Sequence, residues 1–203
     1  QTNWLQVPGQ IIMVFPQAKK RCLFREGKVD EGNYWLTKGK KKLLCDSTKI
    51  ISDMVYLDSV MSQLKANFPI DSLKVFASGF SNGCGLIIQN ILTERPNMFN
   101  AVAGVGSLPQ KEYDSSLENK TPLYLSIGQL DDRFLKHAGL DEFSINYESI
   151  KEVIIFKNTV NFLSPYFNFS KSCNLVNPAH SIRMVYGKND SFATLFILEI
   201  MEG

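Results

Sequence analysis

The sequence predicts an α/β fold, with a mostly parallel β-sheet covered by helices on both faces. Short, nearly continuous apolar runs of strand length alternate with longer segments of helical period. Such runs are typical of strands that are buried on both sides in a parallel sheet. The 203 residues contain no internal repeat and no linker-like stretch, so we expect a single domain spanning 1–203.

Six apolar runs are expected to form the strands of this sheet. They are 11–16 (IIMVFP), 73–78 (LKVFAS), 101–107 (AVAGVGS), 122–128 (PLYLSIG), 181–187 (SIRMVYG) and 194–200 (TLFILEI). The region after the first run is expected to be a long polar and basic loop, in which "TKGKKK" (37–42) is solvated.

Three segments between these runs are expected to be helical. In 49–67, apolar residues recur at steps of three and four: Ile50, Met54, Leu57, Met61 and Leu64. A second helix follows the run at 73–78 and stops before Pro96. A third covers about 148–162.

Composition excludes several classes of function. A net charge of +2 is too small to indicate nucleic-acid binding, and no run of 18 apolar residues could span a membrane. The opening "QTNWLQVPGQ" is not a signal peptide. The four cysteines are Cys22, Cys45, Cys84 and Cys173. They form no CxxC pair, and no histidine lies at ligand spacing from them, so we expect no metal site. Whether they form disulfides stays open.

The stretch "KVFASGFSNGCGLIIQN" (Lys74–Asn90) predicts a catalytic serine. Ser81 lies between Gly79 and Gly83, where a strand gives way to a helix. Such a bend is expected to leave room only for glycine on both flanks, to strain the serine backbone and to expose its hydroxyl, as in a Gly-x-Ser-x-Gly nucleophile elbow. The amide of Asn82, at the helix start, is expected to donate to an oxyanion.

A serine nucleophile needs a base, and the base needs an orienting acid. Asp131 lies three residues beyond the strand at 122–128 and is the expected acid, with Asp132 as the reserve; the alternative role for Asp131 is a helix cap.

Neither histidine fits the role of base. His180 precedes a strand, which predicts a place at the amino end of the sheet, and His137 is too close to Asp131 in sequence to come from a separate loop. Each is expected to be a surface or capping residue. In the order serine, acid, histidine, the base belongs directly after the last strand.

The segment "ANFPIDSLKVFASGFSNGCGLIIQNILTERPNMFNAVAGVGS" (66–107) resembles the core of the polyhydroxybutyrate depolymerase and feruloyl esterase group of α/β-hydrolases. "IIMVFPQAKK", "LSIGQLDDRF" and "LFILEIMEG" are similar to that group's Tyr-Pro-Gln strand, acid loop and last strand. The resemblance implies an α/β-hydrolase-type sheet that is incomplete at both ends. Earlier strands with a His-Gly oxyanion loop should precede Gln1, and the catalytic histidine should follow Gly203.

The resemblance also implies a function: a serine carboxylic-ester hydrolase that works through an acyl-enzyme, without a metal or organic cofactor. Its substrate would be a polyester, a feruloylated or acetylated polysaccharide, or a small ester, and its location extracellular or periplasmic. Two rivals stay open. One is a non-catalytic hydrolase fold that binds a carbohydrate or protein partner, and the other is peptide or thioester cleavage on the same scaffold.

Three further expectations concern single residues, and those for Tyr34, Trp35 and Cys22 are what the resemblance implies. Tyr34 and Trp35 line the acyl or alcohol pocket, or else pack as ordinary loop aromatics. Cys22 lies near a position where the group often has a cysteine, which implies a disulfide. Cys84, inside the helix after the elbow, is expected to be a small core residue rather than a reactive thiol.

Overall fold

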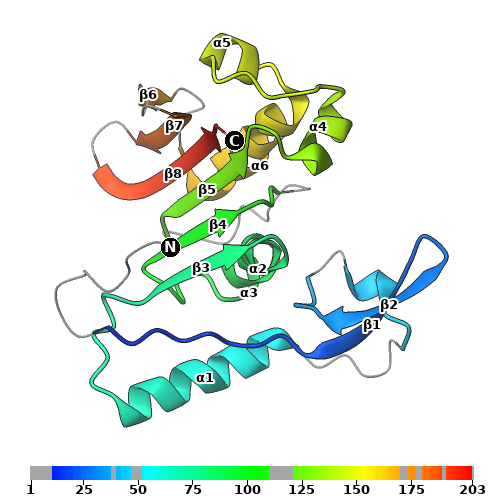
Figure 1. Ribbon diagram of the computed structural model, residues 1–203. Coiled ribbons are helices and arrows are strands. Elements are labelled where there is room, and N and C mark those ends of the chain that lie inside the picture. The colour runs from blue at the N-terminus through cyan, green and yellow to red at the C-terminus, as the bar shows by residue number, and fades with distance from the viewer. Residues whose placement is uncertain are drawn as a thin grey trace.

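The computed structural model describes residues 11–37, 40–46, 52–109, 121–169, 173–176, 180–188 and 191–202. Its main sheet has six strands in the order β3-β4-β5-β8-β7-β6 (Figure 1). Their bounds are β3 Phe76–Phe80, β4 Ala101–Val105, β5 Leu123–Gly128, β6 Asn174–Val176, β7 Ser181–Lys188 and β8 Ser191–Met201. The pairs β3–β4, β4–β5 and β5–β8 are parallel, whereas β8–β7 and β7–β6 are antiparallel. The predicted α/β class, with a mostly parallel sheet, is confirmed by these strand pairings.

Each of the three predicted helical segments is helical with shifted bounds, and Asp132–Ala138 forms a further helix that was not predicted. They are α1 Asp53–Asn67, α2 Asn82–Leu86, a π-helical turn Ile87–Ile91, α3 Leu92–Glu94, α4 Asp132–Ala138, α5 Tyr147–Ile150 and α6 Ile154–Phe167. α1 begins where the Ser52 side chain accepts a hydrogen bond from the Met54 amide, which caps the helix. The helix expected at 148–162 is two helices, α5 and α6. No helix in the described ranges is long and apolar enough to cross a membrane.

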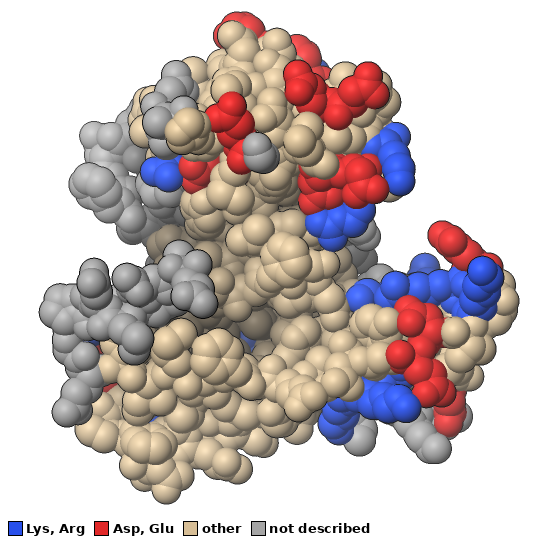
Figure 2. Space-filling model, viewed as in Figure 1, with Lys and Arg blue, Asp and Glu red and all other residues tan. Residues whose placement is uncertain are grey.

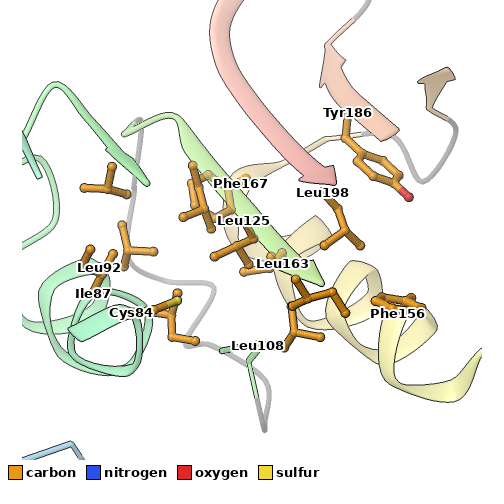
Figure 3. Close-up of a cluster of buried hydrophobic side chains, with 14 of the residues drawn as sticks. Cys84, Ile87, Leu92, Leu108, Leu125, Phe156, Leu163, Phe167, Tyr186 and Leu198 are labelled. Carbon is orange, nitrogen blue, oxygen red and sulfur yellow. The ribbon is translucent and has the colours of Figure 1, made fainter. Parts of the chain in front are cut away.

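The buried core joins one face of the sheet to α2, α3 and α6 (Figure 3). A Cβ on Gly104 would lie 2.4 Å from the Cys84 sulfur, so glycine lets α2 pack closely on β4. Cys84 itself is fully buried, as predicted. On the opposite face of β3, Phe76 and Phe80 are 64% and 72% exposed. Among the described residues, no helix covers this face of β3, although helices were expected on both faces of the sheet.

The predicted buried strand at 11–16 is wrong. Residues Ile11–Phe15 form no helix or strand and pair with no described strand, and their exposed fractions run from 42% to 81%. An apolar run becomes a strand only where a neighbour accepts its backbone hydrogen bonds. β3 is the last strand on its side of the described sheet, and it does not extend to this segment.

The loop predicted after 11–16 instead contains a hairpin, β1 (Lys20–Arg25) and β2 (Lys28–Asn33). Its two-residue turn, Glu26 and Gly27, has positive φ at both positions, as right-handed twist requires in a tight hairpin. A disulfide joins Cys22 in β1 to Cys45, which agrees with the expectation for Cys22. The expectation that "TKGKKK" is solvated holds for Lys41 and Lys42, but Thr37 is buried and Lys40 is partly buried. Lys40–Leu43 form a 3₁₀ turn, and Lys38 and Gly39 lie outside the described residues.

A buried ion pair fastens this hairpin to the main body. Arg21 Nη2 lies 2.7 Å from Asp53 Oδ1 at the start of α1, and the two side chains are 9% and 3% exposed. The other carboxylate oxygen of Asp53 accepts a hydrogen bond from the Leu36 amide at 2.6 Å. One carboxylate thereby holds the hairpin, α1 and the segment that follows β2.

Candidate active site

Ser81 lies at the carboxyl end of β3, between the strand and α2, as predicted. Its backbone has φ 48° and ψ −107°, a combination that non-glycine residues rarely adopt. The conformation is held from both sides, because the Ser81 amide donates to the Val105 carbonyl at 2.7 Å and the Gly85 amide donates to the Ser81 carbonyl at 2.9 Å. Strain of this kind persists only where the surroundings fix it, and it is typical of functional positions.

The two glycines beside Ser81 have different roles. A Cβ on Gly79 would lie 2.5 Å from the carbonyl carbon of Gly83 and 2.7 Å from the Cys84 nitrogen, both backbone atoms. A Cβ on Gly83 would meet nothing within 4 Å. The prediction that both flanks need glycine for room is therefore right for Gly79 and wrong for Gly83.

Asn82 is the first residue of α2, so its amide has no acceptor within the helix and is available near Ser81. Its side chain is engaged elsewhere: Oδ1 accepts from the Trp35 amide at 2.8 Å, and Nδ2 donates to the Trp35 carbonyl at 3.1 Å. The Trp35 ring stacks on Tyr56 and packs against the core. The structure thus makes Trp35 a packed residue that fixes the elbow, whereas Tyr34 belongs to the hairpin.

Asp131 lies at the same edge of the sheet as Ser81, because β3, β4 and β5 run parallel and both residues follow the ends of their strands. It is also the N-cap of α4, accepting a hydrogen bond from the Arg133 amide at 3.2 Å, which is the alternative role considered for it. Its side chain is only 13% exposed. Asp132, the reserve acid, is 73% exposed and pairs with Lys136 on the surface.

Arg133 bridges the serine and the acid, and the sequence reasoning missed it. Its Nε and Nη2 donate to the two Asp131 oxygens at 2.9 and 2.5 Å, and its Nη1 donates to Ser81 Oγ at 3.2 Å. A Cβ on Gly106 would lie 3.1 Å from Nη2, so glycine there leaves room for the guanidinium. Arg133 touches the two groups that a base must touch, but a guanidinium has no acceptor and stays protonated, so it cannot take the serine proton.

The structure corrects the placement of His180. β7 runs antiparallel to β8, with Ser181 opposite Met201, so the start of β7 lies at the same edge as Ser81 and not at the opposite one. His180 pairs there with Glu202 at 2.7 Å. Four strand spacings of about 4.8 Å separate β7 from β3, roughly 19 Å in all. His180 is therefore too far from Ser81 to serve it.

His137 is occupied within its own helix, where Nδ1 lies 2.7 Å from the Arg133 carbonyl oxygen. The carboxyl end of β8, by contrast, lies beside the acid loop, because the Gln129 amide donates to the Met201 carbonyl at 2.7 Å. A residue placed directly after β8 would emerge near Asp131. This agrees with the place that the resemblance gives to the base.

The Asp131–Arg133 pair predicts a pH effect. Hydrogen bonds from the Arg133 side chain hold the pKa of Asp131 below its ordinary value. The folded state therefore binds fewer protons than the unfolded state. The pair stabilises the fold at pH values above the pKa that Asp131 has in the unfolded chain. This stabilisation is lost as the pH falls through the lower pKa that Asp131 has in the folded protein. Because the Arg133 side chain is half exposed, we expect the pair to add less than about 1 kcal/mol to the free energy of unfolding.

The measurement is urea unfolding between neutral and acid pH. Arg133→Met should unfold at slightly lower urea than the parent at neutral pH, and the two should converge in acid. A difference that stays constant down to the lowest pH would contradict the assignment.

Comparison of the sequence with protein-family models and with curated proteins gives no match.

Proposed function

We propose that this chain is the catalytic portion of a serine carboxylic-ester hydrolase, with Ser81 as its nucleophile. The observation that carries the proposal is the backbone of Ser81, held at φ 48° where a strand meets a helix across the close contact of Gly79 with Gly83. That strain and that close contact together are the features a nucleophile elbow requires.

In the proposed reaction, Ser81 Oγ attacks the ester carbonyl carbon while a general base takes the hydroxyl proton. The negative charge that develops on the carbonyl oxygen is stabilised by the Asn82 amide. The C–O bond to the alcohol then breaks, the base returns the proton to the departing oxygen, and water hydrolyses the acyl-serine by the same steps. Asp131 orients the base.

We assign the base, from the resemblance, to the segment after β8. Arg133 Nη1 donates to an oxygen lone pair of Ser81, so the hydroxyl proton stays available to a base. The disulfide between Cys22 and Cys45 supports an exported protein, since such bonds persist in oxidising compartments.

One observation favours the rival function. The side chain that contacts both Ser81 and Asp131 is an arginine, which cannot act as a base, as expected of a non-catalytic binding fold. The same test separates the two candidates.

The test is turnover of p-nitrophenyl acetate by the natural protein and by Ser81→Ala. We expect kcat to fall by at least about 10³-fold in the variant, since serine hydrolases depend on the nucleophile to that extent. Thioester and peptide substrates run in parallel identify the preferred bond. Equal turnover by Ser81→Ala would overturn the role of Ser81, and no turnover by either protein would favour the binding fold.

A further inference from the structure

The β1–β2 hairpin and the turn after it carry the excess positive charge of the chain. Residues 19–46 contain nine basic and four acidic residues, a net +5, whereas the whole chain has +2. Figure 2 shows Lys and Arg side chains gathered over this projecting part of the molecule, with acidic side chains among them. Positive charge concentrated on one projection raises the local concentration of anions.

Two of these cations converge on the ring of Tyr34. Arg25 Cζ lies 5.2 Å and Lys40 Nζ lies 5.0 Å from the ring centroid. The ring rests on Gly32, where a Cβ would lie 2.9 Å from ring atoms, and its hydroxyl donates to both oxygens of Asp30 at 2.8 Å. Glycine and aspartate thus fix the ring, and the ring holds the two cations close together.

These cations are poorly neutralised. Arg25 Nη1 is 3.7 Å from Asp30, a long ion pair, and its Nε and Nη2 are buried without a hydrogen-bond partner. Lys40 forms no ion pair with any residue in the described ranges, and burial together with Arg25 lowers the pKa of Lys40 to about 8. Lys28 lies directly opposite Arg25 in the hairpin register, where like charges destabilise each other. An anion bound here would relieve this repulsion.

The cluster is connected to the candidate active site. Tyr34 precedes Trp35, whose backbone is hydrogen-bonded to the side chain of Asn82, the residue after Ser81. We propose that Arg25 and Lys40, held together by the ring of Tyr34, bind a carboxylate on the substrate, so that the substrate is an ester carrying a free carboxylate, such as an ester of an acidic polysaccharide. Asp30 repels a second negative charge, which favours a carboxylate over a phosphate dianion. The substrate assignment rests on the proposed function, but the binding of the carboxylate does not.

The test is calorimetric titration of Ser81→Ala, which prevents turnover, with oligogalacturonate. The matched ligand is the same oligosaccharide with its carboxylates methyl-esterified, and inorganic phosphate is the third probe. We expect oligogalacturonate to bind at least tenfold more tightly than the other two, and its binding to weaken with salt. Equal affinity for the charged and neutral oligosaccharides, or tighter binding of phosphate, would overturn the proposal.

Variants locate the site. Lys40→Gln and Arg25→Gln should each weaken oligogalacturonate binding about tenfold, whereas Lys65→Gln, which removes the same charge from an exposed position on α1, should not. Thermal unfolding of each variant checks that the fold persists. Equal loss in all three would mean unspecific attraction and contradict the site. Binding of oligogalacturonate without any Ser81-dependent hydrolysis would support this binding site and contradict the proposed function. Ser81-dependent hydrolysis without binding of oligogalacturonate would support the proposed function and contradict this binding site.

Discussion

Gly79→Ala is expected to lower the free energy of unfolding by about 3 kcal/mol or more and to destroy the elbow. The added methyl carbon would lie 2.5 to 2.7 Å from three backbone atoms of Gly83 and Cys84. Side chains can rotate away from an added methyl group, but backbone atoms can yield only if β3 and α2 separate. Overpacking of this kind reaches the upper end of the usual range of about 1–3 kcal/mol, or exceeds it. Urea unfolding followed by circular dichroism measures the change.

Gly83→Ala is the matched control, two residues beyond the nucleophile on its other side. An added Cβ there meets no atom within 4 Å, and alanine is the better helix former, so stability should be unchanged or should rise by up to about 1 kcal/mol. If the two variants unfolded at the same urea concentration, the close approach of β3 and α2 at Gly79 would be refuted.

Asp53→Ala is expected to destabilise the protein by about 3–5 kcal/mol, which is typical when one partner of a buried ion pair is removed. The substitution leaves the guanidinium of Arg21 buried without its carboxylate and removes the acceptor of the Leu36 amide. Because that carboxylate joins the hairpin to α1, the segment holding Trp35 against Asn82 should loosen as well. Hydrogen exchange of the Leu36 and Trp35 amides, measured with urea unfolding, reports both effects.

Asp58→Ala is the control for this prediction, since it removes an aspartate from the same helix. Asp58 pairs with Arg95, but the two side chains are 40% and 42% exposed, and exposed pairs contribute little. The free energy of unfolding of Asp58→Ala should stay close to that of the parent. A loss in Asp58→Ala as large as that in Asp53→Ala would show that the buried pair has no special role.

The elbow could be predicted from sequence because its signals are local. Two apolar runs of different period meet at Gly79, Ser81 and Gly83, and the backbone of that bend depends on those few residues. Strands β4 and β5 were predictable for the same reason, as continuous apolar runs bounded by turn residues. The edge on which Asp131 lies followed once the strands were taken to be parallel.

What the sequence did not reveal depends on contacts between distant segments. The hairpin is mostly polar and is held by the Cys22–Cys45 disulfide and by the Arg21–Asp53 pair, neither of which has a periodic signal. The run at 11–16 has strand composition but no described partner. His180 was assigned to the wrong edge because the direction of β7 is set by its pairing with β8.

Arg133 was missed for another reason. It lies two residues after Asp131, in "DDRF", and that spacing alone does not say whether the guanidinium turns toward the serine or toward solvent. An arginine within one helical turn of a predicted acid is a signal that deserves weight, because its fork matches a carboxylate in geometry and charge.

The most direct measurement is the covalent labelling of the native protein by a fluorophosphonate, followed by peptide mapping. We predict one adduct, on Ser81, that forms on the folded protein and fails to form after unfolding in urea. An adduct on another serine at a similar rate, or labelling that survives unfolding, would show that the bend after β3 does not activate its hydroxyl.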